Sequence, residues 1–256
     1  MYPVKPPKFV AVLNGVREVS LRGLADAGCW GPLMRAADLQ LARKNGQAQV
    51  LLSAVESRYM GIAFRELSIS LLVRHPEGHA TGNCYYLACA FNSSRLFAFV
   101  ERTYFRTPYF PARIEVDVRL PVSFAANRRD GLLVSAKMAP DASAPRDPIR
   151  CGDESWEGPI FLPPSRGAGR RQRKWFAARL AGDTQVYPFV PQRDEVEVIP
   201  SRGHPVVQLL AESDFAGQEW IVRESAIHAR SKTYIQKELM LAAKVEAPAL
   251  ETPACG

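Results

Sequence analysis

One carboxylate in an apolar stretch is well placed for acid–base chemistry. Glu66 opens the stretch ELSISLLVR (66–74), and strand periodicity puts it on one face with Ser68, Ser70 and Leu72. A carboxyl group on a buried face needs a partner or acquires a raised pKa, and a raised pKa suits a general acid or base. The same alternation also fits a strand whose polar face lies in solvent.

Tyr109 is the second candidate, in the segment RTYFRTPYFPAR (102–113). Arg102 and Arg106 precede it by seven and three residues, and Arg113 follows it. A phenol among cations can donate a hydrogen bond to a carbonyl, or act as an acid or base if the arginines lower its pKa. The sequence leaves open which arginines point the same way. An aromatic ring that only packs at the start of a strand fits the pattern equally well.

Other reactive residue types form weaker patterns. His75 and His79 have H-x-x-x-H spacing, but HPEGH reads as a turn, so no metal site is expected there. His204 and His228 are isolated in the sequence, and no phosphate-loop, dinucleotide or nucleophile-elbow motif occurs. Lys137 lies in a strand and could supply an inward-facing amine, although strand lysines usually face solvent.

The positive charge of the chain is concentrated in one segment. The net charge is +7, and SRGAGRRQRKW (165–175) contributes five positive charges next to Trp175. Two glycines in this segment favour a solvated loop, although the tryptophan could stack on a base. Elsewhere acidic and basic residues are interleaved, so we expect no nucleic-acid partner. The five positive residues are Arg166, Arg170, Arg171, Arg173 and Lys174.

Length and cysteine usage favour a soluble cytoplasmic protein. The 256 residues suffice for a large core, and we expect one domain over 1–244 followed by a flexible tail, 245–256. The five cysteines form no C-x-x-C pair, which argues against a disulfide framework or zinc ribbon. No apolar run approaches the roughly 20 residues of a membrane span, and the N-terminus lacks an apolar signal region. We therefore expect no membrane partner.

Strand patterns dominate the chain, and helical patterns are few. A helix is expected over 32–46, with Pro32 near its start, and another from Ser93 or Ser94 to before Pro108. Residues 139–153 read as a long loop, and turns at 75–79 and 127–131 suggest hairpins. This mixture predicts an α+β domain built on a largely antiparallel barrel. The expected strands are 49–56, 67–74, 83–91, 112–120, 131–138, 185–190, 195–199, 219–226 and 232–241.

The order of elements over residues 64–116 is distinctive: a strand beginning F-R-E-L, a hairpin, an aromatic strand, a capped helix, R-x-x-x-x-x-P-Y and another strand. This order resembles the acetoacetate decarboxylase-like superfamily, and in particular its YqjF-type branch of uncharacterised proteins. The resemblance covers about a fifth of the chain convincingly. It rests on Glu66-Leu67, Val73-Arg74, Tyr85-Tyr86, Arg102, Pro108-Tyr109-Phe110 and Ala112-Arg113.

The resemblance implies a cone-shaped, mostly antiparallel β-barrel with a few short helices and a central cavity. In the decarboxylases a lysine after the helix forms a Schiff base, and its lowered pKa is a known case of activation by a neighbouring cation. Tyr109 occupies the corresponding position here, and Glu66 corresponds to an acidic residue of the family. A phenol forms no iminium, so amine-dependent decarboxylation at this position is excluded.

We therefore expect a lyase-like enzyme of secondary metabolism that acts on an oxo-acid or polyketide-like compound by dehydration, cyclisation or aldol-type proton shuttling. It would need no cofactor and could form a homo-oligomer. Glu66, Tyr109 and Arg102 would be catalytic, with Glu66 as acid and base and Tyr109 with Arg102 polarising a carbonyl or binding a carboxylate. A non-catalytic barrel that binds a small molecule is the alternative. The expected substrate contacts are Arg106, Tyr85, Tyr86, Phe105 and Arg113.

Overall fold

The computed structural model describes residues 7–76, 84–128, 131–140, 146–164 and 173–235. Strands predominate in these residues, as the sequence predicts. The three helices are α1 (Ala27–Ala37), α2 (Arg95–Thr103) and α3 (Pro205–Glu212). The strands are β1 (Phe9–Ala25), β2 (Ala48–Tyr59), β3 (Ile62–Val73), β4 (Cys84–Asn92), β5 (Tyr109–Pro111), β6 (Arg113–Asp117), β7 (Ser123–Arg128), β8 (Gly131–Lys137), β9 (Arg150–Leu162), β10 (Lys174–Pro188), β11 (Glu195–Val198), β12 (Ala216–Ser231) and β13 (Tyr234–Ile235).

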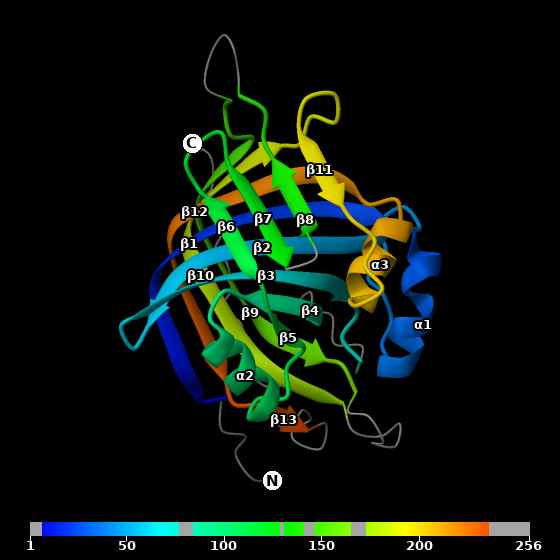
Figure 1. Ribbon diagram of the computed structural model, residues 1–256, viewed down its shortest axis with the longest axis vertical. Helices are drawn as coiled ribbons and strands as arrows, with labels where there is room; N and C mark the ends of the chain where they lie inside the picture. The colour runs from blue at the N-terminus through cyan, green and yellow to red at the C-terminus, as the bar shows by residue number, and fades with distance from the viewer. Residues whose placement is uncertain (1–6, 77–83, 129–130, 141–145, 165–172, 236–256) are drawn as a thin grey trace, which may run out of the picture.

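The main sheet curls strongly on itself. Its nine strands follow the order β12-β1-β2-β3-β4-β9-β10-β13, with β5 paired to β4. Strand β10 also pairs with β12, so the sheet curls round until its first strand meets β10. The pairings are antiparallel except those of β4 with β5 and with β9. A second, four-stranded sheet, β11-β8-β7-β6, lies over β1–β3, as Figure 1 shows. The α+β, cone-shaped barrel expected from the sequence is confirmed.

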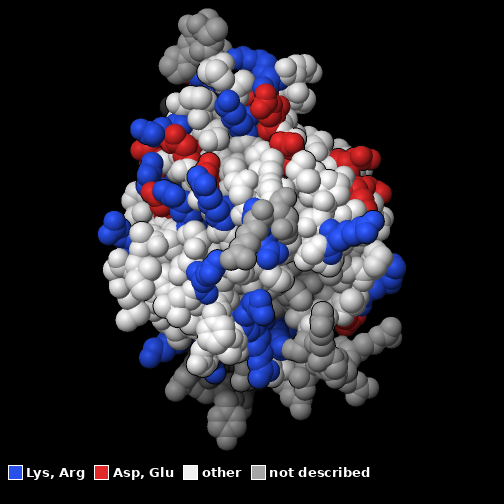
Figure 2. Space-filling model, in the orientation of Figure 1, with Lys and Arg blue, Asp and Glu red and all other residues white. Residues whose placement is uncertain are grey.

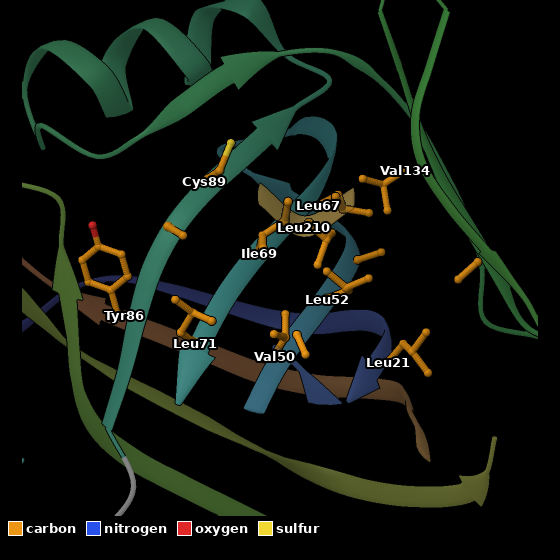
Figure 3. Packing of buried hydrophobic residues seen from close by; sticks show 14 of the residues in the cluster. Leu21, Val50, Leu52, Leu67, Ile69, Leu71, Tyr86, Cys89, Val134 and Leu210 are labelled. Carbon is orange, nitrogen blue, oxygen red and sulfur yellow. The ribbon is translucent and has the colours of Figure 1, made fainter. Parts of the chain in front are cut away.

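One face of the main sheet packs in the hydrophobic core. Leu67, Ile69 and Leu71 of β3 are fully buried, and they lie in one cluster with Val134 of β8 and Leu210 of α3 (Figure 3). The core therefore fills the space between the main sheet and the elements that cover it. Because successive side chains of a strand point to opposite faces, β3 sends its polar residues to the other side of the sheet.

That other side is the inner face of the curled sheet. Tyr85 on β4 contacts Arg22 on β1 through a side-chain hydrogen bond. Strands β2 and β3 separate these two strands in the sheet, so the contact must cross the interior of the curl. Leu72 on β3 stands opposite Tyr85 and therefore shares its face. Glu66 lies on the same face as Leu72, because alternate residues of a strand point to the same side. The polar face of β3 thus points into the barrel.

The first helix differs from the predicted range. Helix α1 begins earlier because the Asp26 side chain accepts a hydrogen bond from the Gly28 N–H, and it contains Pro32 rather than starting there. It ends at Asp38, whose φ of 55° is left-handed and whose N–H bonds to Arg35 and Met34 carbonyls. The prediction of a helix over 32–46 was therefore wrong in its second half, because a local cap ends the helix first. Helix α2 begins after Ser94, whose hydroxyl caps Phe97 N–H, as predicted.

Two strands occupy segments that were read as loops. Strand β9 begins at Arg150 inside the expected loop 139–153, and β10 begins at Lys174 at the end of the basic segment. Arg166, Arg170 and Arg171 lie outside the described residues. Both strands are extended because they pair with each other along an uninterrupted antiparallel ladder, from Lys174–Leu162 to Val186–Arg150. Within the described part of the chain, no helix is long and apolar enough to cross a membrane.

A buried aspartate, Asp194, connects the segments on either side of it and before β9 to strand β12 of the barrel. Asp194 forms a two-pronged ion pair with Arg146, at 2.7 and 2.8 Å, and both side chains are almost fully buried. It also accepts hydrogen bonds from the N–H groups of Ala139 and Val190 and from Trp220 Nε1 of β12. These donors hold its pKa at about 2 against the opposing effect of burial. Asp194 is thus ionised, and its negative charge strengthens the hydrogen bonds that it accepts from these donors.

Asp194→Asn should destabilise the fold by about 3–5 kcal/mol, because it removes the buried negative charge that pairs with Arg146. The free energy of unfolding in urea measures this. Glu157→Gln is the matched control, since it breaks the exposed Glu157–Arg179 pair and should cost less than about 1 kcal/mol. Equal losses in the two variants would contradict the role given to Asp194.

Candidate functional site

A carboxyl group and a phenol meet on the inner face of the barrel. The Tyr109 hydroxyl donates a hydrogen bond to Glu66 Oε1 at 2.5 Å. Strand β5 runs parallel to β4 and sets Tyr109 opposite Ala90, while β3 sets Glu66 opposite Asn92, so the two side chains converge over β4. Tyr109 is 7% exposed and packs with Leu87, Leu162 and Phe176, among others. The pair is held by two strands and an apolar wall.

Burial sets the protonation of both groups. Burial and, to a smaller extent, the charge of Glu101 raise the pKa of Glu66, while the Tyr109 hydrogen bond, Arg230 and His228 lower it; the net pKa is about 7. Burial and the neighbouring Glu66 also raise the pKa of Tyr109 well above its usual value. The arginines expected to lower that pKa therefore do not do so. Tyr109 stays a hydrogen-bond donor, and Glu66 is the group that exchanges a proton near neutrality.

An arginine of β12 stands beside this pair. Arg230 Nη1 lies 2.6 Å from both carboxylate oxygens of Glu101, on α2. Its guanidinium lies over the rings of Phe105 and Phe176, at 4.5 and 4.3 Å from their centroids. Its Nε and Nη2 atoms are buried and have no hydrogen-bond partner among the described residues. A buried donor without a partner is costly, which makes these two atoms candidates for binding an acceptor.

A second cluster of charges lies on the inner face around Glu18 of β1. The Glu18 carboxylate contacts Arg223 Nη1 at 3.1 Å and His228 Nε2 at 3.2 Å, and accepts hydrogen bonds from Ser20 and Ser53. Burial raises the pKa of Glu18, but the bond to His228, the charge of Arg223 and the remaining bonds lower it to about 2. Glu18 is therefore a fixed anion, and His228 is not isolated in the fold.

No local pattern in the sequence points to these partners. Arg223 and His228 are 205 and 210 residues from Glu18 in the chain, and Arg230 is 129 residues from Glu101. Only the placement of β1 beside β12 brings the Glu18 cluster together. A usable signal was the run of alternating polar residues Glu18, Ser20 and Arg22, which has the period of a strand.

The residues predicted for the site fall into separate groups. Tyr85 lies on the inner face, edge to face with Trp156 at 5.2 Å. Phe105 lies against Arg230. Tyr86 points to the opposite face and is fully buried in the main core, away from Glu66. Arg113 lies on the second sheet, largely exposed, in an ion pair with Glu115.

Arg102 and Arg106 lie elsewhere again. Both are exposed, and the Arg102 guanidinium lies over the Phe110 ring at 5.8 Å. They line a hollow beside Lys174. Lys174 is 4% exposed, whereas Lys137, the amine considered from the sequence, is exposed on the second sheet. Among the described residues, no three His, Cys, Asp or Glu side chains are grouped to hold a metal ion.

Known structures share this architecture. An acetoacetate decarboxylase superposes with a TM-score of 0.59 at 10% identity, over 91% of this chain and 90% of that one. The acetoacetate decarboxylase of Legionella pneumophila gives 0.59 at 13% identity, over 91% and 88%. The enduracididine biosynthesis enzyme MppR, solved with pyruvate, gives 0.58 at 10% identity, over 92% and 91%.

The fold is that of the acetoacetate decarboxylase-like enzymes. At these identities the likeness concerns the fold, and the chemistry of this chain has to be argued from its own residues. No protein-family model matches the sequence. No curated protein matches it either.

The raised pKa of Glu66 predicts a pH-dependent stability. The folded carboxyl group binds its proton more tightly than the unfolded one, whose pKa is 4.5. The stabilisation is therefore complete below pH 4.5 and is lost as the pH rises to about 7. Glu66→Gln removes this dependence, so the stability of the wild type relative to the variant should fall by about 3 kcal/mol across that window.

Urea unfolding at pH 4 and pH 8 measures the difference. Glu115→Gln, an exposed carboxylate on the second sheet, is the control and should follow the wild type at both pH values. If Glu66→Gln also runs parallel to the wild type, the pKa of Glu66 is not raised.

Proposed function

We propose that this protein is an enzyme that moves protons on a small oxo-acid or polyketide-like substrate inside the barrel. Glu66 is its acid and base. One observation carries the proposal: a carboxyl group with a pKa of about 7 is held by a phenol on the inner face of a barrel. A general acid or base works best when its pKa lies near the pH of the reaction, so Glu66 can both accept and return a proton.

Tyr109 positions Glu66 and sets its protonation. Its hydroxyl fixes one carboxyl oxygen, Oε1, which leaves Oε2 to exchange a proton with the substrate. The raised pKa of Tyr109 keeps the phenol protonated, so it stabilises the carboxylate form without competing as a base. Glu66 would take a proton from the carbon next to a carbonyl group and return it later in the same turnover. This step serves dehydration, cyclisation and aldol-type reactions alike.

Arg230 is suited to bind the carboxylate of an oxo-acid. Its Nε and Nη2 form one edge of the guanidinium, and both are buried without a partner in the described structure. An arginine edge matches a carboxylate through two parallel hydrogen bonds. Glu101 and the two phenylalanine rings hold the guanidinium in place. Arg230 therefore takes the anion-binding part of the role expected of Arg102, whose guanidinium lies over Phe110.

The neighbours in fold support the substrate class. MppR has been solved with pyruvate and with the condensation product of pyruvate and imidazole 4-carboxaldehyde. Pyruvate carries a carboxylate beside a ketone. Arg230 would bind the carboxylate, and Glu66 would take a proton from the carbon next to the ketone. We further propose that the chain belongs to the YqjF-type branch and that Tyr109 stands where the decarboxylases carry their lysine. The reaction would then proceed without a Schiff base.

Exchange of the methyl protons of pyruvate in D₂O tests the proton transfer without knowledge of the full substrate. The wild type should catalyse exchange near pH 7, followed by NMR. Glu66→Gln should lower the rate by about 100-fold or more, the usual scale for loss of a general base. Tyr109→Phe should also lower it, and should shift the pH profile because the Glu66 carboxylate loses its donor.

Glu115→Gln is the control for the exchange assay and should exchange protons at the wild-type rate. Wild-type exchange in Glu66→Gln would refute the role of Glu66. A wild-type protein that binds pyruvate but exchanges no protons would favour the non-catalytic binding barrel.

A trapping experiment tests the absence of a Schiff base. Borohydride added to the wild-type protein with pyruvate or acetoacetate should give no covalent adduct by mass spectrometry, because a phenol forms no iminium. Peptide mapping locates any adduct that does form. An adduct on Lys174, the buried amine of the described residues, would contradict the proposed mechanism.

A further inference from the structure

A basic hollow lies beside the segment that joins α2 to β5. It has a volume of about 250 Å³ and is lined by three cations, Thr107 and three prolines. No carboxylate is among its described lining residues. Figure 2 shows Lys and Arg side chains gathered in the region of α2 and β5, with few acidic ones among them on this face. The lining residues are Arg102, Arg106, Thr107, Pro108, Pro163, Pro164 and Lys174.

Lys174 makes the hollow more than a patch of surface charge. Its side chain is 4% exposed at the start of β10, whereas surface lysines extend into solvent. Its pKa is lowered by burial and then by the positive charge of Arg106. Lys174 and Arg106 therefore present two cations to the same hollow, one from a strand and one from the turn before β5.

The backbone around the hollow is fixed. Arg106 has a left-handed φ of 55°, which non-glycine residues adopt at a cost. Thr107 holds this turn, since its N–H and hydroxyl both bond to the Glu101 carbonyl and its hydroxyl also lies 2.8 Å from the Glu101 carboxylate. The prolines add rigid walls. The cations are therefore presented by a constrained turn and a strand.

We propose that this hollow is a binding site for a compact oxyanion, such as phosphate or a small dicarboxylate. Two guanidinium groups can each present paired donors to such a group, and Lys174 adds a compact charge at the base. The volume accommodates an ion of this size. The site is separate from Glu66 and Tyr109, and the inference does not rest on the proposed reaction.

Titration calorimetry with inorganic phosphate and with malonate at low ionic strength tests the site. The wild type should bind at least one of these anions saturably, and more weakly as salt rises. Lys174→Met, which preserves the length and apolar stem of the side chain, should weaken binding about tenfold or more, and so should Arg106→Ala. Arg113→Ala removes an exposed arginine outside the hollow and should bind as the wild type does.

Two further comparisons separate this site from the proposed active site. Glu66→Gln should bind the anion normally even if it loses proton exchange, and circular dichroism should show that Lys174→Met remains folded. A fold loss in Lys174→Met leaves Arg106→Ala, on an exposed side chain, as the deciding variant. Unchanged affinity in the folded variants, or no saturable binding by the wild type, would overturn the proposal.

Discussion

The pairing of β10 with β12 is the constraint on which the site depends. It curls the main sheet round on itself, so one sheet face becomes an interior with restricted access to water. Charged side chains on that face lose most of their hydration and must be compensated by partners or change their protonation. The same polar alternation on an open sheet would give ordinary surface residues. The curl of the sheet therefore buries the polar residues of alternating strands and so changes their pKa values or their pairing.

Two glutamates on this inner face show the two outcomes. Glu18 has Arg223, His228 and serine donors at its carboxylate, and its pKa falls to about 2. Glu66 has one neutral donor at its carboxyl group, and its pKa rises to about 7. The difference comes from the number and charge of hydrogen-bond partners, because burial raises the pKa of both. One glutamate is a fixed charge, and the other can exchange a proton at neutral pH.

Local patterns predicted the parts of the fold that local physics controls. The period of β3 placed Glu66, Ser68 and Ser70 on one face, and Ser94 marked the start of α2. The partners of Glu18 and Arg230 could not be predicted in this way, because they come from strands and helices far apart in the chain. The cap at Asp38 that ends α1 was missed because it depends on one residue adopting a left-handed conformation.

Helix α2 links the inner site to the outer hollow. Glu101 on α2 binds Arg230, beside Glu66, and through its carboxylate and carbonyl it also binds Thr107, which lines the hollow. The Tyr109 N–H in turn bonds to the Thr107 carbonyl. A change in the turn at Thr107 would therefore act on both members of the Glu66–Tyr109 pair, on the phenol through the backbone and on the carboxyl group through the charges of Glu101 and Arg230. Consecutive hydrogen bonds through Glu101 and Thr107 thus connect the surroundings of the Glu66–Tyr109 pair to the turn that lines the hollow.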